Sequence, residues 1–149
     1  MNNNYDIMQS FTFVDTNPGY KAPVRLPINE VHVYRRKRYS LITFSAQLIP
    51  EFERAGIQSV RLAKNNFTGD YALVFTSGAE GHTVHYKSWG RKAAKNSLRV
   101  TSATLVDALF RAFDMPDGSD YLELELSSDN SRRPDVKFFT IQKIDMPKI

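Results

Sequence analysis

Two segments of this chain carry closely similar sequences, and an internal repeat limits the possible folds more than any other feature of the sequence. SLITFSAQLIPEFERAG at 40–56 aligns with SLRVTSATLVDALFRAF at 97–113 without a gap. Seven of the 17 aligned positions are identical: Ser40/Ser97, Leu41/Leu98, Ser45/Ser102, Ala46/Ala103, Leu48/Leu105, Arg54/Arg111 and Ala55/Ala112. The alignment predicts that one structural unit occurs twice.

Each copy reads as a short strand, a polar helix cap and an amphipathic helix. Ser45 and Ser102 stand where an N-cap belongs, because a serine hydroxyl can accept a hydrogen bond from the first helical turn. Apolar residues then recur at helical spacing in both copies. Gly56 is suited to end the first helix in a left-handed conformation. Pro50 is unfavourable deep inside a helix, so the first helix is expected to begin near it, after a tight turn.

Strands are predicted on both sides of each helix from alternating or β-branched apolar runs bounded by turn residues. They are expected at 31–34, 41–44, 60–63 and 71–75 in the first unit, and at 82–86, 98–101, 121–126 and 136–141 in the second. Each unit, 31–76 and 82–144, then has the order β-β-α-β-β. One unit of about fifty residues is too small to be stable alone, so both are expected to share a core.

The fold class predicted is therefore α+β, mostly β, with two tandem β-β-α-β-β units forming one pseudo-twofold barrel. Residues 31–149 are expected to form this single duplicated domain. Residues 1–30 contain an asparagine run, glycine and prolines, which favour an extended N-terminal arm with at most one short strand at 11–14.

Composition excludes several protein classes. The chain has no cysteine, which excludes disulfide staples and thiolate metal sites and is compatible with the cytoplasm. It has no apolar run long enough to span a membrane, and its first residues lack the basic and apolar segments of a signal peptide. We therefore expect a cytoplasmic protein with no membrane partner.

Charge is distributed unevenly along the chain. Residues 1–106 carry twice as many basic as acidic side chains, whereas acidic residues predominate in 107–149. Two stretches, 31–50 and 81–106, contain no acidic residue. This layout favours a localised anionic partner.

The basic residues concentrate between the first and second strands of each unit. They are Arg35, Arg36, Lys37 and Arg38 in the first unit, and Lys87, Arg91, Lys92 and Lys95 in the second, with Arg99 just after. A twofold would bring the two basic loops to equivalent places on one face, where they could contact phosphates along a duplex groove. The sequence predicts a nucleic-acid-binding site, with duplex DNA preferred over RNA.

Other readings of these segments remain open. Trp89, Tyr86, Tyr34 and Tyr39 flank the cations and could stack on unpaired bases of single-stranded DNA or RNA, or they could be strand residues with one packed face. The basic loops could also meet the acidic surface of a protein. The chain would then be a non-enzymatic interaction or assembly module, and self-association is left open.

The order of elements and two segments resemble the AbrB/SpoVT family, the swapped-hairpin DNA-binding domains of bacterial transition-state regulators and antitoxins. Gly90-Arg91 in SWGRKAAKNSLRVTS is similar to the Gly-Arg loop of that family, and GIQSVRLAKNNFTGDYALVF to its helix end and final hairpin. The resemblance covers about 31–142. It implies a DNA-binding barrel of the transcription-regulator or mobile-element type, with both units in one chain instead of two.

No catalytic or cofactor motif is present. The chain lacks a nucleophile elbow, a P-loop, a metalloprotease motif and a dinucleotide fingerprint. His82 and His85 would point to opposite faces of one strand, without a third ligand nearby. We therefore expect no enzyme activity, no cofactor and no metal site.

Overall fold

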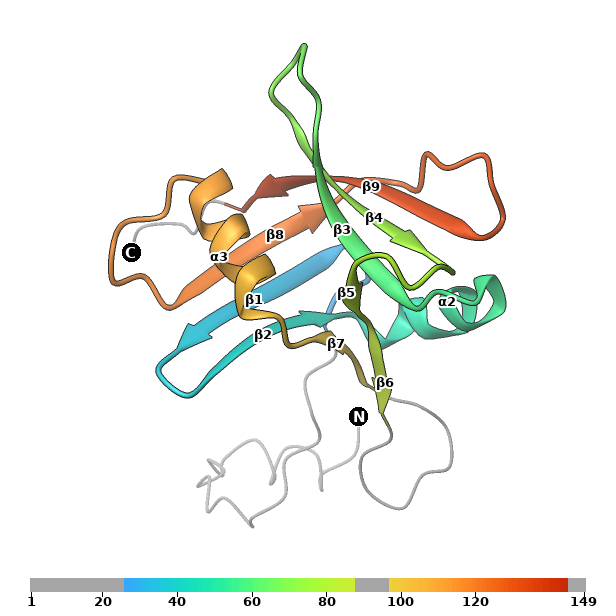
Figure 1. The fold of residues 1–149 in the computed structure, drawn as a ribbon, viewed down its shortest axis with the longest axis horizontal. Coiled ribbons are helices and arrows are strands. Elements are labelled where there is room, and N and C mark those ends of the chain that lie inside the picture. Colours follow the sequence, from blue (N-terminus) through green and yellow to red (C-terminus); the bar gives the residue numbers. More distant parts are fainter. Residues whose placement is uncertain (1–25, 88–96, 145–149) are drawn as a thin grey trace, which may run out of the picture.

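The computed structural model describes residues 26–87 and 97–144 (Figure 1). The elements in the first part are β1 (Glu30–Arg36), β2 (Tyr39–Phe44), the 3-10 helix η1 (Ala46–Leu48), α2 (Ile49–Ala55), β3 (Ser59–Lys64) and β4 (Tyr71–Thr76). Those that follow are β5 (His82–Thr83), β6 (His85–Lys87), β7 (Ser97–Val100), α3 (Ala103–Ala112), β8 (Tyr121–Leu126) and β9 (Val136–Lys143). The predicted arm residues 1–25, including the strand at 11–14, and most of the second basic loop lie outside the described residues.

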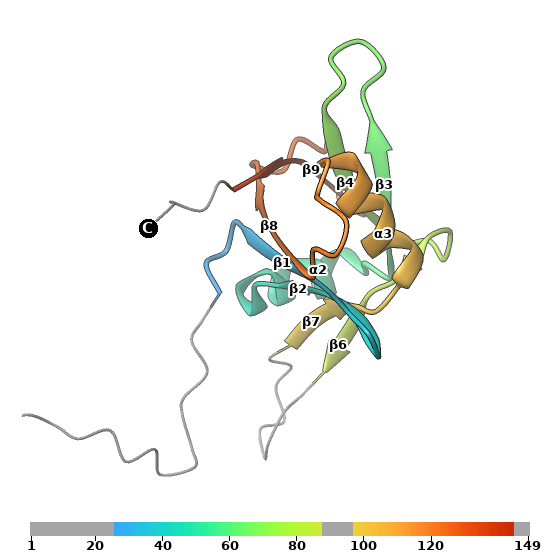
Figure 2. The same cartoon turned by 90° about the vertical axis from the view of Figure 1, so that its left-hand side faces the viewer.

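All described strands belong to one antiparallel sheet in the order β5-β3-β4-β9-β8-β1-β2-β7-β6. The two end strands of this order, β5 and β6, are consecutive in the chain and are separated by Val84 alone. The sheet therefore curls into a nearly closed barrel (Figures 1 and 2). The prediction of a mostly β, barrel-like fold is confirmed.

The prediction of one continuous strand at 82–86 is wrong. It is broken at Val84, so that β5 pairs with β3 and β6 pairs with β7. The backbone N–H of Val84 still donates to the carbonyl of Gln58, at 2.9 Å, and its side chain is buried. One bent segment thus joins both ends of the sheet.

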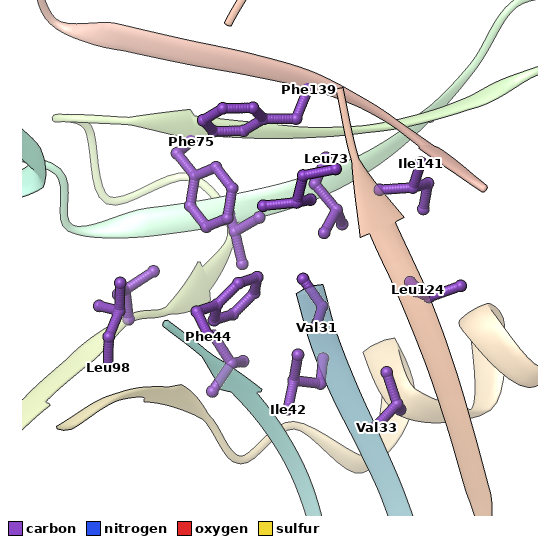
Figure 3. Close-up of a cluster of buried hydrophobic side chains, with 14 of the residues drawn as sticks. Val31, Val33, Ile42, Phe44, Leu73, Phe75, Leu98, Leu124, Phe139 and Ile141 are labelled. Atoms are coloured by element: carbon purple, nitrogen blue, oxygen red, sulfur yellow. The ribbon is translucent and has the colours of Figure 1, made fainter. Parts of the chain in front are cut away.

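The core lies inside the barrel and follows from the alternation of apolar residues along the strands. Val31 and Val33 of β1 and Ile42 of β2 are fully buried, while the residues between them are not. Phe44 of β2 packs edge-on against Phe75 of β4, with ring centroids 5.3 Å apart (Figure 3). Each large apolar side chain buried in this way contributes about 1.5–3 kcal/mol.

The two predicted serines cap the 3-10 helix η1 and the helix α3, whereas α2 begins at Ile49, near Pro50 as expected. The Ser45 hydroxyl accepts a hydrogen bond from the N–H of Gln47, and the Ser102 hydroxyl accepts one from Leu105. Pro50 lies in the first turn of α2, preceded by η1, where its missing N–H is tolerated. Gly56 ends α2 with a φ of 71°, which a side chain would disfavour.

The gapless alignment of the two repeats holds in the helices but not in the preceding strands. Leu41 and Leu98 are identical in sequence, yet Leu98 is fully buried whereas Leu41 is only half-buried. The cause is Thr101, an extra residue between the end of β7 and its helix cap, whereas Ser45 directly follows β2. By side-chain orientation, Phe44 therefore corresponds to Val100, one position away from the gapless match.

Two further features bear on what the barrel can bind. The β3–β4 hairpin projects well beyond the barrel (Figures 1 and 2) and presents Phe67, which is 100% exposed, near its tip. None of the helices in the described part of the chain combines the length and hydropathy needed to cross a bilayer.

Candidate nucleic-acid interface

The β1–β2 hairpin presents three consecutive cations at its tip. Arg36 pairs with Tyr39, so Lys37 and Arg38 form a two-residue turn, and all three basic side chains are exposed. Among the described residues, no carboxylate lies within 4.0 Å of their charged nitrogens. The tip is therefore a local concentration of positive charge that is not neutralised by ion pairs within this part of the chain.

Arg35 differs from these neighbours and corrects one detail of the prediction. Like Arg36, it belongs to β1 and not to the loop, but its guanidinium carbon lies 4.2 Å from the centroid of the Phe110 ring in α3. Its Nη2 donates to the carbonyl of Ser119 at 3.2 Å, and its Nη1 lies 3.5 Å from Asp107 Oδ1. These contacts attach α3 to the end of β1, so this guanidinium is largely engaged within the protein.

The outer face of the sheet around β2 carries a row of polar residues. Strand register aligns Glu123, His32, Thr43, Arg99 and His85 across β8, β1, β2, β7 and β6. Their neighbours along the strands, such as Val33 and Ile42, face the core, so the row faces outward. Arg99, predicted just after the second basic loop, lies in the middle of this face.

The ends of the second basic loop lie at the other end of this face. Lys87 pairs with Ser97, and the next residue of β7, Leu98, pairs with Phe44 at the C-terminal end of β2. The turn at Lys37 and Arg38 precedes the N-terminal end of the same strand. At about 3.3 Å per residue, the two places are separated by about 20 Å along β2. Arg91, Lys92, Lys95 and Trp89 lie outside the described residues.

Aromatic side chains line the face beside the hairpin. The Tyr34 and Tyr121 rings are 5.1 Å apart, and the Arg36 guanidinium carbon lies 5.6 Å from the Tyr34 centroid. Tyr121 also contacts the ring of His32, at 5.6 Å. Sequence analysis missed Tyr121 because its place beside Tyr34 depends on the pairing of β8 with β1, which are far apart in the chain.

Tyr86 is not part of this outer aromatic group. Its hydroxyl donates to the carbonyl of Ile57 at 2.7 Å, and burial, together with the negative charge of Glu53, raises its pKa to about 12. For Tyr86, the alternative of a strand residue with a packed face is thus correct.

Acidic residues mark the opposite edge of the outer face. The Tyr121 hydroxyl donates to Glu123 Oε1 at 2.5 Å, and His32 Nε2 lies 3.7 Å from the same oxygen. Burial and the Glu123 carboxylate both raise the pKa of Tyr121 well above its usual value. Glu30 pairs with Glu125 on the same side. Phosphates are therefore favoured near the hairpin tip and disfavoured at this edge.

A cleft of about 490 Å³ lies elsewhere, between the chain before β1, the start of α2 and the β8–β9 hairpin. Its apolar residues include Leu48, Leu126 and Phe139, and its carboxylates are those of Glu51, Glu125 and Asp129. These acids make it a poor site for an anion. No group of three or more potential metal ligands occurs within the described ranges 26–87 and 97–144.

No family model, curated protein or solved structure matches this chain. Its function is therefore argued from the arrangement of charges and rings on the outer face.

Proposed function

We propose that this protein binds DNA without acting as an enzyme, through phosphate contacts made by the tip of the β1–β2 hairpin and the outer sheet face beside it. The observation that carries the proposal is the tip itself, where Arg36, Lys37 and Arg38 are exposed and lack a carboxylate partner among the described residues. Arginine suits bidentate contacts to phosphate, and lysine supplies a point charge.

The composition of the turn supports a binding role. Two-residue hairpin turns favour Asn-Gly or Gly at positions of positive φ, because such turns match the twist of the strands. Lys37 and Arg38 have none of these residue types, and neither has a positive φ. The turn is therefore not of the type that requires Asn or Gly, and both positions can carry cations that an anionic ligand can contact.

The distance between the two basic connectors favours a duplex as the ligand. These connectors are the turn at Lys37 and Arg38 and the segment between Lys87 and Ser97. They leave the outer face about 20 Å apart along β2, with Arg99 between them. The major groove of B-DNA is about 12 Å wide, so its two flanking backbones lie on a similar scale. Duplex DNA could therefore contact both connectors at once, as the sequence predicts.

We also propose that the chain is an internal duplication with pseudo-twofold symmetry. Exchanging β1 with β5–β6, β2 with β7, β3 with β8 and β4 with β9 converts each strand pairing into another observed pairing. The exchange also superposes residues that are buried in both halves: Val31/Val84, Phe44/Val100, Phe52/Leu109, Val60/Leu126, Leu73/Phe139 and Phe75/Ile141. The axis would pass through the pairs Thr43–Arg99 and Leu73–Phe139.

This symmetry supports the proposed relationship to the AbrB/SpoVT family, in which two chains build one barrel. The exchange makes the turn at Lys37 and Arg38 equivalent to the connector between Lys87 and Ser97. Two equivalent basic connectors on either side of an axis suit a roughly symmetric DNA site. A regulator of transcription or a factor carried by a mobile element would use such a site.

The test compares two triple variants of equal charge. Arg36→Ala, Lys37→Ala and Arg38→Ala removes the hairpin cations, whereas Arg61→Ala, Lys64→Ala and Arg132→Ala removes three exposed cations elsewhere. We expect the first variant to lose most duplex affinity and to lower the slope of log K against log salt by about 2.7. The second should bind like the wild type. Equal losses in both variants, or salt-independent binding, would contradict the proposal.

A second candidate function is a protein-interaction module, favoured by Phe67. Asn65 Oδ1 accepts hydrogen bonds from the N–H groups of Phe67 and Thr68, at 2.8 and 3.2 Å, so an ordered turn holds this exposed ring in water. Exposed aromatic residues are frequent anchors in protein interfaces. Light scattering over a range of concentrations distinguishes the two functions, because a monomer that retards DNA in a gel argues against this one.

A further inference from the structure

The outer side of the β1–β2 hairpin combines rings with cations. Arg36 and Tyr39 are cross-strand partners, as are Tyr34 and Leu41, and cross-strand partners share one face of a sheet. Tyr121 joins them from β8, in contact with Tyr34. We call this group of five residues the hairpin face.

Two rings of the hairpin face, Tyr34 and Tyr121, are held by contacts, and the ring of Tyr39 is exposed beside them. Tyr39 is 52% exposed, and Tyr34 and Tyr121 are half-buried. Tyr34 packs between Tyr121 and the Arg36 guanidinium, while the hydrogen bond from the Tyr121 hydroxyl to Glu123 fixes the far end of the group. Three partly exposed rings, of which Tyr34 and Tyr121 are tilted by 40° to each other, thus lie beside the cationic tip.

We propose that the hairpin face stacks unpaired bases, so that the ligand is duplex DNA with an adjoining single-stranded segment. This inference rests on the DNA binding proposed above and names the form of DNA that fits the site. Base stacking on aromatic side chains tolerates any sequence, because every base has a flat π-face, while neighbouring cations hold the backbone. In a duplex, the base faces are stacked on each other and cannot reach the tyrosines.

The positions of basic and acidic side chains indicate where a strand of DNA would lie on the outer face. Phosphates can contact Arg36, Lys37 and Arg38 at the tip, while Glu30, Glu123 and Glu125 exclude them from the other edge of the outer face. The DNA strand therefore crosses the β1–β2 hairpin near its tip, where Tyr39 is the most exposed ring of the hairpin face.

The decisive experiment measures anisotropy of labelled DNA with variants of Tyr39. The probes are an oligothymidine and a random-sequence duplex of equal length. Tyr39→Ala and Tyr39→Leu remove the ring, and Tyr39→Phe keeps it. Phe67→Ala is the matched control, because it removes an exposed ring from the β3–β4 hairpin, which projects away from β1 and β2 (Figures 1 and 2).

We expect the wild type to bind both oligothymidine and the duplex. Tyr39→Ala and Tyr39→Leu should weaken oligothymidine binding roughly tenfold, with little change for the duplex, while Tyr39→Phe and Phe67→Ala bind both probes like the wild type. Unchanged melting temperatures would show that the variants are folded.

The two proposals fail in different ways. If the duplex binds in a salt-dependent manner but the Tyr39 variants change neither probe, or change both equally, base stacking is wrong and DNA binding stands. If the wild type binds neither probe, both proposals are wrong. Tight binding of oligothymidine that Tyr39→Leu leaves intact also overturns base stacking.

Discussion

The guanidinium of Arg35 lies over the ring of Phe110, with 4.2 Å between its central carbon and the ring centroid. The next residue, Arg36, lies on the other face of the same strand, above Tyr34. Two adjacent arginines in a run of four basic residues thus contact different surfaces. The alternation of side chains along β1 separates a packing arginine from one available to a ligand.

Arg35 and Arg36 should therefore differ in their effect on stability. Arg35→Ala removes the ring contact and the hydrogen bond to Ser119, and we expect the free energy of unfolding to fall by about 1–2 kcal/mol. Arg36→Ala should change it by less than about 0.5 kcal/mol because the side chain is exposed. Urea unfolding measures both values, and equal losses would show that the two side chains do not have separate roles.

Replacing the hairpin turn should separate binding from folding. In the variant Lys37→Asn with Arg38→Ser, ordinary turn residues that need no positive φ replace both cations, so stability should change by less than about 0.5 kcal/mol. Two charges are lost, so the salt slope for duplex binding should drop by about 1.8. Thermal melting and DNA titration at several salt concentrations provide the measurements. An unchanged slope would remove these two cations from the interface.

Replacing Ser102 should lower the free energy of unfolding more than replacing Thr101, the other residue between β7 and α3. Ser102→Ala leaves the N–H of Leu105 without the hydroxyl acceptor, 3.1 Å away, and should cost about 1 kcal/mol. Thr101→Ala, at the exposed preceding residue, is the control and should be near neutral. Chemical denaturation of both variants gives the comparison, and similar values would argue against a capping role.

Alkaline pH should weaken the fold through the buried tyrosine hydroxyls. The pKa of Tyr86 is raised to about 12 in the folded chain, against about 10 when unfolded, so the folded state retains a proton that the unfolded state loses between these values. The free energy of unfolding should therefore fall as pH rises from about 10 to 12. Tyr121 adds to the same trend, because its pKa is also raised.

Tyr86→Phe tests the source of this pH dependence. It removes one titrating group, so the decrease in stability above about pH 10 should be shallower than in the wild type. The variant also loses the hydrogen bond to Ile57, so the comparison concerns the slope with pH and not the absolute value. A slope equal to that of the wild type would assign the effect to other groups.

Gly81 should be essential for the approach of β5 to β3. A Cβ atom at this position would lie 2.7 Å from the carbonyl oxygen of Val60, a backbone atom that cannot easily move. We expect Gly81→Ala to destabilise the fold by about 1–3 kcal/mol. Gly78→Ala is the control, because its Cβ would meet only the Thr76 hydroxyl at 3.8 Å. Similar melting temperatures for the two variants would contradict this expectation.

Local pattern was sufficient to predict most elements of the fold. The run at 121–126 alternates leucine with glutamate and forms β8 with these bounds, and the predicted serine caps lie at the start of η1 and of α3. Periodicity and capping act within a few residues, so they can be read from the sequence.

The features that were missed depend on contacts between distant segments. The break at Val84 arises because β5 and β6 pair with different strands, and no local pattern records that change of partner. The one-residue offset between the repeats is similar, because Leu41 and Leu98 differ in the side of the sheet that they face. Likewise, the pairing of β8 with β1 brings Tyr121 beside Tyr34, and the packing of α3 against β1 engages Arg35 with Phe110.

The bend at Val84 divides what would be one margin strand into the short end strands β5 and β6. The pairings of β5 and β6 span only two and three residues. Exposed sheet margins are where β-proteins most often aggregate or exchange strands. Here covalent continuity through Val84 joins the two end strands, so the margin that another chain could extend is shortened.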